Sequence, residues 1–106
     1  MADPRVKHLK ISCNVVKRLL KDKLSYENEV KTLQKSHEDE VSSEADEYKI
    51  KKTKSLLDES KTMVDDCNKR LAEAIGKLGS IIGECKDLFE AEEFKTAKSF
   101  YDSISQ

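Results

Sequence analysis

A three-and-four spacing of apolar residues runs through the second half of the chain. The spacing takes in twelve positions, ten of them apolar or cysteine: Ile50, Thr53, Leu57, Ser60, Val64, Cys67, Leu71, Ala74, Leu78, Ile81, Cys85 and Leu88. A mean step of about 3.5 residues keeps one stripe facing a neighbouring helix, whereas the period-two alternation of a half-buried strand is absent. The pattern predicts one long amphipathic helix over about residues 46–84.

This stripe is wider than the seam of a two-stranded coiled coil. Leu56 and Met63 lie one residue before stripe positions, and Ile75 and Ile82 lie one residue after them. A widened apolar stripe is typical of a helix that contacts two neighbours. We therefore expect a bundle of at least three helices.

The first part of the chain predicts a second long helix, over about residues 4–41. Asp3 suits the N-cap, and Pro4 suits the first turn, where its missing N–H costs nothing. An apolar stripe follows in two parts, and the second part is offset from the first by one residue. The first part is Val6, Leu9, Cys13, Val16 and Leu20, and the second is Leu19, Lys23, Tyr26, Val30, Leu33 and His37. Such a helix would be about 55 Å long, so we expect a rod.

Between these helices, residues 36–47 carry six acidic residues and no Lys or Arg. Ser42 and Ser43 supply turn chemistry, and the segment has weak apolar periodicity. We interpret it as a solvated hairpin connection. A calcium loop is the alternative, but the spaced Asp, Asn and Gly residues of an EF-hand are missing.

A third, shorter helix is predicted over about residues 88–104. Asp87 and Glu90 resemble a capping box, and an apolar stripe follows that includes Phe94 and Tyr101. We place three glycines, Gly76, Gly79 and Gly83, on the outer face of the preceding helix. Gly83 can also end this helix. The predicted fold is all-α, an elongated antiparallel three-helix bundle, up-down-up, with coiled-coil-like packing as in a spectrin-like rod, forming a single domain over residues 1–106.

Composition narrows the class of protein. Charged residues make up 39% and apolar residues 37%, which suits a thin helical bundle, while the sustained periodicity argues against disorder. A net charge of −1 gives no reason to expect nucleic acid or membrane as a partner. No signal peptide is expected from the polar start, and three cysteines on apolar stripes suit reduced thiols in the cytosol.

Catalytic and metal-binding motifs are absent from the sequence. It contains no HExxH, Walker, GxSxG or GxGxxG motif, and no CxxC spacing for zinc. His8 and His37 are a helix length apart, and neither has a nucleophile at a recognisable spacing. We expect no enzyme, no cofactor and no metal site.

Several stretches, taken in order, resemble the tubulin-binding cofactor A family, also called tubulin-specific chaperone A. They cover nearly the whole chain at matching length, and the longest runs from Glu59 to Leu71 (ESKTMVDDCNKRL). The others are MADPRV (1–6), LKI (9–11), VVKRL (15–19), YENE (26–29), YKIKK (48–52) and KDLFEAEEFK (86–95). The family usually has a proline where this chain has Asp65, so the resemblance implies a weaker kink in the second helix.

The resemblance implies a small three-helix bundle of the eukaryotic cytosol with a chaperone function. The family captures quasi-native β-tubulin released from the cytosolic chaperonin and passes it to other tubulin-folding cofactors, which assemble the α/β heterodimer. It needs no nucleotide or metal of its own. The partner implied for this chain is therefore β-tubulin.

Candidate binding residues follow from charge and from the matched stretch. Residues 1–35 hold nine Lys or Arg against four Asp or Glu, and this basic first helix suits an acidic tubulin surface. It contributes Lys10, Lys17, Arg18 and Lys21. The stretch that resembles the family adds Glu59, Asp66, Lys69 and Arg70. The alternative is that these side chains only face solvent, as Lys commonly does on helices. We expect four stripe residues of the second helix to be core: Leu57, Val64, Cys67 and Leu71.

A structural coiled-coil scaffold or homodimerisation module is the alternative function, because the wide stripe of the second helix could be buried between chains. We expect a monomer or a weak homodimer. An interfacial membrane helix is disfavoured, since the stripes contain small and polar interruptions and the chain lacks Trp.

Overall fold

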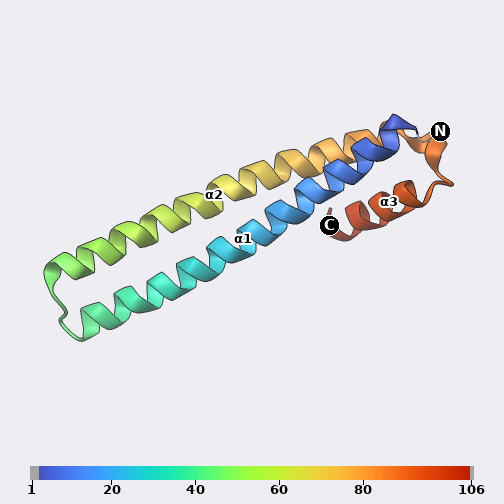
Figure 1. The fold of residues 1–106 in the computed structure, drawn as a ribbon. Helices are drawn as coiled ribbons and strands as arrows, with labels where there is room; N and C mark the ends of the chain where they lie inside the picture. The colour runs from blue at the N-terminus through green and yellow to red at the C-terminus, as the bar shows by residue number, and fades with distance from the viewer. Residues whose placement is uncertain (1–2, 106) are drawn as a thin grey trace. The chain divides into compact units, whose positions relative to one another are not determined.

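The computed structural model describes residues 3–105, and within that range it contains helices and no strand. Helix α1 spans Pro4–Ser42, α2 spans Glu47–Glu84, a 3₁₀ turn η1 spans Lys86–Leu88 and α3 spans Glu92–Ile104 (Figure 1). The predicted all-α fold with three helices is confirmed. Helix α2 continues without a break through Asp65.

The chain divides into two compact units, and both long helices pass through each of them. We call one the three-helix unit: it comprises the described residues of Met1–Leu20 and Arg70–Gln106. The other, the hairpin unit, comprises Lys21–Lys69. The assignment of residues 1–106 to a single domain stays a prediction.

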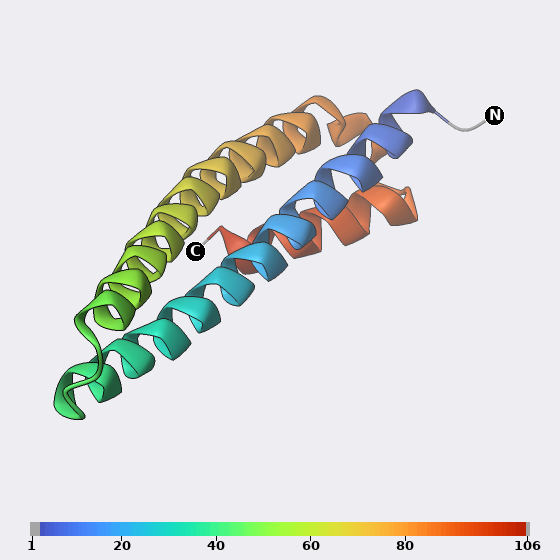
Figure 2. The same cartoon turned by 60° about the vertical axis from the view of Figure 1, so that its left-hand side comes forward.

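The three-helix unit is built around one apolar core. In both views α3 lies alongside the first part of α1 (Figure 2). All three helices contribute buried side chains, which are Leu9, Cys13, Val16, Leu71, Ala74, Leu78, Ile82, Cys85 and Ala97. Complete burial of a leucine or valine side chain stabilises a fold by about 1.5–3 kcal/mol. Leu9, Val16 and Leu78 are each 0% exposed, so they form the centre of this core.

Gly79 does not lie on the outer face of α2, which corrects the prediction for this residue. A Cβ atom built on Gly79 would lie 2.8 Å from the Tyr101 hydroxyl and 3.0 Å from its ring, whereas Gly76 and Gly83 have open space around them. The α3 ring therefore packs against the α2 backbone, an approach that only glycine allows. The sequence pattern did not reveal this contact because Tyr101 comes from another helix.

The start of α3 also differs from the prediction. It begins at Glu92 instead of about residue 88, and its N-cap residue Ala91 makes no side-chain capping hydrogen bond. The expected capping residue, Asp87, lies in η1, where its carboxylate accepts hydrogen bonds from Arg5. Glu92 and Glu93 occupy the first turn instead, and their charges favour a helix N-terminus.

Arg5 joins the start of α1 to η1. Its backbone N–H donates to Asp3 Oδ1 at 2.9 Å, which confirms Asp3 as the N-cap of α1. Its guanidinium lies 2.7 Å from Asp3 Oδ2 and 2.8 Å from Asp87 Oδ2. These hydrogen bonds from Arg5 lower the pKa of Asp3 to about 2 and lower the pKa of Asp87.

In the hairpin unit, the end of α1 and the start of α2 run antiparallel, joined by residues 43–46. The connection is shorter than the predicted 36–47 because α1 continues to Ser42, so half of the acidic residues belong to α1. Glu44 takes a left-handed conformation with φ 54. The Ala45 N–H donates to the Glu40 carbonyl and the Glu44 N–H to the Val41 carbonyl, the pattern of a Schellman cap.

Replacement of Gly79 by Ala should destabilise the protein relative to replacement of Gly76 by Ala. Gly76→Ala gains helix propensity, up to about 1 kcal/mol, without meeting another atom. Gly79→Ala must push the Tyr101 ring away, and overpacking of this kind costs about 1–3 kcal/mol. Urea unfolding of both variants measures the difference, and equal stabilities would contradict the packing of Tyr101 on α2.

Replacement of Arg5 by Gln should lower the melting temperature at neutral pH, and this loss should shrink in acid. A carboxylate whose pKa is lowered in the folded state stabilises that state at pH values above 3.8, its pKa in the unfolded chain. This stabilisation is lost as the pH falls toward about 2. Thermal unfolding at several values between about pH 5 and pH 2 tests the trend. Lys51→Gln, which removes an exposed pair with Glu47, is the control and should show little change at any pH.

Replacement of Glu44 by Gly should stabilise the protein by about 0.5–1 kcal/mol, because glycine adopts the left-handed conformation without the cost of a Cβ. Glu44→Ala removes the same charge but keeps the Cβ, so it should bring no such gain. Denaturant unfolding of the two variants separates the backbone effect from the loss of charge.

Candidate functional site

The outer surface of α1 in the three-helix unit carries two apolar side chains. Ile11 is 52% exposed and Val15 is 46% exposed. They are one helical turn apart and, at 3.6 residues per turn, point away from the core positions Leu9, Cys13 and Val16. The sequence analysis missed this pair because it followed only the buried stripe. An apolar pair spaced by four residues on the opposite side of the helix was the available signal.

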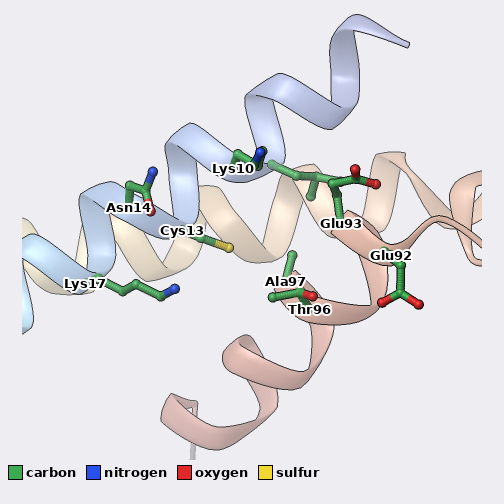
Figure 3. A pocket seen from close by; sticks show the side chains of 9 residues that line it. Lys10, Cys13, Asn14, Lys17, Glu92, Glu93, Thr96 and Ala97 are labelled. Carbon is green, nitrogen blue, oxygen red and sulfur yellow. The ribbon is translucent and has the colours of Figure 1, made fainter. Parts of the chain in front are cut away.

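Arg18 lies on the same side of α1, three residues beyond Val15, and its side chain is exposed. Lys10 and Lys17 lie on the adjacent flank, which faces α3 (Figure 3). The structure therefore brings together three of the predicted binding residues beside the exposed apolar pair. We call this surface, Lys10, Ile11, Val15, Lys17 and Arg18, the α1 face.

A pocket of about 210 Å³ borders this face between α1 and α3. Lys10 and Lys17 line its α1 side, while Glu92 and Glu93 line its α3 side (Figure 3). The remaining lining residues are Leu9, Cys13, Asn14, Thr96 and Ala97. The pocket therefore presents cations on one wall and carboxylates on the other.

Lys17 is held at the edge of this pocket by an aromatic ring. Its Nζ lies 5.3 Å from the centre of the Phe100 ring on α3, within the range of a cation–π contact. The Cys13 sulfur points from α1 toward α3 (Figure 3). Burial raises the pKa of the Cys13 thiol, more than Lys17 lowers it, so the sulfur stays protonated and weakly nucleophilic.

The other predicted binding residues do not join this cluster. Arg70 belongs to the three-helix unit but does not line the pocket, and four residues belong to the hairpin unit: Lys21, Glu59, Asp66 and Lys69. All five side chains are exposed. Within residues 3–105, none of the eight predicted residues takes part in an ion pair. Their cations and carboxylates are therefore available to a partner.

Three of the four core assignments on α2 are confirmed. Leu57, Cys67 and Leu71 are 1%, 5% and 7% exposed, and Val64 is half-buried. Across the described part of the chain, no group of His, Cys, Asp and Glu side chains is arranged to hold a metal ion. Over the same residues, every helix is too short or too polar to cross a bilayer.

Comparison with known proteins places the chain in a family. The model of the tubulin binding cofactor A family matches residues 4–101. The chain belongs to this family. Tubulin-specific chaperone A of Rattus norvegicus is 44% identical over 104 residues, which cover 98% of this chain and 96% of that protein. Tubulin-folding cofactor A of Arabidopsis thaliana is 36% identical over 95 residues, which cover 88% of this chain and 84% of that protein.

Solved structures of this family have the same fold. A human tubulin chaperone cofactor A structure superposes with a TM-score of 0.81 at 40% identity and covers 97% of this chain and 100% of that chain. The crystal structure of tubulin folding cofactor A from Arabidopsis thaliana gives a TM-score of 0.84 at 32% identity and covers 96% of both chains. The resemblance seen in the sequence is confirmed. The chain is not an enzyme, because this family consists of binding cofactors.

Proposed function

We propose that this protein is a tubulin-folding cofactor that captures β-tubulin after its release from the chaperonin. It stabilises the quasi-native subunit in the cytosol and hands it to other tubulin-folding cofactors for assembly of the α/β heterodimer. Family membership and relatives named tubulin-specific chaperone A, 44% identical over nearly the whole chain, support a tubulin chaperone. The α1 face is the single structural observation that favours capture of a protein client.

The exposed pair Ile11 and Val15 fits a client that presents apolar surface before it has joined its partner subunit. Two adjacent aliphatic side chains cover such surface and lose contact with water when they bind. They occupy a rigid helix, so little conformational entropy is lost on binding. About half of each side chain of this pair stays in contact with water in the free protein, and burial against a client explains its position.

The cations of the α1 face supply the second part of the interaction. Lys10, Lys17 and Arg18 are exposed and match the negative charge of a tubulin surface. Charge complementarity at an exposed rim speeds association and sets specificity, while it adds modest affinity. Moderate affinity permits release, which a hand-over step requires.

We assign a secondary role to the predicted residues outside this face. Arg70 on α2 and four residues of the hairpin unit offer further charged side chains to tubulin: Lys21, Glu59, Asp66 and Lys69. Each is solvated and has no ion-pair partner within residues 3–105, so its replacement should weaken binding less than changes on the α1 face.

Capture of labelled β-tubulin, freshly released from chaperonin, tests the function, with α-tubulin as the control client. Native gels or size exclusion should show a selective complex with β-tubulin. Ile11→Ser with Val15→Ser should weaken it by about tenfold or more, since these apolar contacts lie at the centre of the proposed interface. Lys17→Glu with Arg18→Glu should weaken it to a similar degree and make binding less sensitive to salt.

Lys31→Glu with Lys35→Glu is the matched control, because it reverses the same charges at exposed positions of the same helix within the hairpin unit. Circular dichroism should show that all variants remain folded, as surface replacements usually change stability by about 0.5 kcal/mol or less. Failure of the folded parent protein to bind β-tubulin would overturn the function. Full binding by both α1 variants would remove the α1 face from the interface.

A further inference from the structure

The Lys17 ammonium shares a pocket with two carboxylates but pairs with neither of them. Glu92 and Glu93 line the α3 wall of this pocket, yet within residues 3–105 no ion pair crosses it (Figure 3). Asp102, two residues beyond Phe100 on α3, pairs with Lys98 at 2.7 Å instead. The three-helix unit therefore leaves the charge of Lys17 without a counter-charge of its own.

The Phe100 ring supplies the contact that Lys17 does make. The Lys17 Nζ atom lies 5.3 Å from the centre of this ring. Phe100 is half-buried and packs against the apolar core, so the ring is fixed on its inner side. The face of an aromatic ring attracts a cation but carries no net charge that would neutralise it. The ring thus holds the ammonium in place and leaves its positive charge available.

A lysine held in this way is prepared for binding. A free lysine side chain has many rotamers, and their loss on binding opposes association. Part of this loss has already occurred where a ring restrains the side chain. Lys10 is the contrast, because it lines the same pocket but lies over no aromatic ring in the described part of the chain.

We propose that Phe100 is a positioning residue of the α1 face, whose ring holds Lys17 beside the pocket with its charge directed to an acidic client. The inference rests on the proposed function and adds to it a residue of α3. Phe100 acts through Lys17 and need not touch the client itself. The α1 face therefore depends on a second helix for the arrangement of its cations.

Proton NMR of the free protein tests the contact without a client. Protons above the face of an aromatic ring are shifted upfield, so the signal of the Lys17 methylene next to Nζ should lie upfield of the corresponding Lys10 signal. Phe100→Leu keeps an apolar side chain for packing but should remove this shift, whereas Phe100→Tyr should retain it. An unshifted Lys17 signal in the parent protein would overturn the proposal.

Affinity for β-tubulin tests the consequence. Phe100→Leu should weaken binding about threefold, and Lys17→Met should weaken it about fivefold. The two replacements together should be no worse than Lys17→Met alone, because both act on the same cation. Phe100→Leu combined with Lys10→Met should instead give the product of the two single effects. Phe100→Tyr should bind like the parent protein.

Salt dependence separates positioning from a simple loss of packing. An exposed cation speeds association by an attraction that salt screens. Phe100→Leu should therefore flatten the fall of the association rate with salt, as Lys17→Met does. Ile104→Ala is the matched control, since it removes another half-buried apolar side chain that packs on the core from α3. It should keep the salt dependence of the parent and the Lys17 signal, and circular dichroism checks that each variant is folded.

Two results of the binding experiments would overturn the proposal. Phe100→Leu could bind β-tubulin as tightly as the parent protein, or its effect could multiply fully with that of Lys17→Met. Failure of the parent protein to bind β-tubulin at all is a different result, which would overturn the proposed function. The NMR signals of Lys17 would then still decide whether Phe100 holds this cation.

Discussion

Burial of Leu9, Val16 and Leu78 is the interaction on which the three-helix unit depends. These side chains come from the first part of α1 and the last part of α2, and none of them has any contact with solvent. Helix α3 has only 13 residues, a length at which an isolated helix is marginal in water. It persists because Ala97 enters the same core and Tyr101 packs on the bare backbone at Gly79. The turn that precedes α3 is tied to α1 by the two carboxylates that share Arg5.

The same burial leaves several apolar side chains exposed at the surface. Once the stripes of α1 and α2 are buried, Ile11 and Val15 in one unit and Tyr48 and Leu56 in the other remain exposed, as do Leu24, Val41 and Phe89. Scattered apolar residues are normal on protein surfaces, but here each pair lies beside cations on a rigid helix.

The charges of the α1 face suit one class of partner. The α1 face carries cations beside its apolar pair, which fits an acidic client. Cys13, by contrast, is buried with a raised pKa, so its thiol plays a packing role beneath the pocket.

Hydrophobic periodicity by itself determined the three helices, most of their bounds and the core of α2. This succeeded because a stripe at helical spacing reports burial within a single element, as at Leu57, Cys67 and Leu71. The charge of the first helix also predicted Lys10, Lys17 and Arg18 as binding residues, and their role in binding stays a prediction. Ordered stretches of sequence also identified the family.

Only the tertiary structure decided what depends on contacts between elements. Asp87 was expected to cap α3, yet its carboxylate accepts a hydrogen bond from Arg5, which lies 82 residues earlier in the chain. Gly79 was placed outside because nothing in its own helix indicates that Tyr101 approaches it. The exposed pair Ile11 and Val15 acquires significance only once the core is seen on the other side of α1. Local periodicity specifies which face of a helix is buried, but the partner that buries it, and the polar groups left free at the surface, are set by the packing of distant segments.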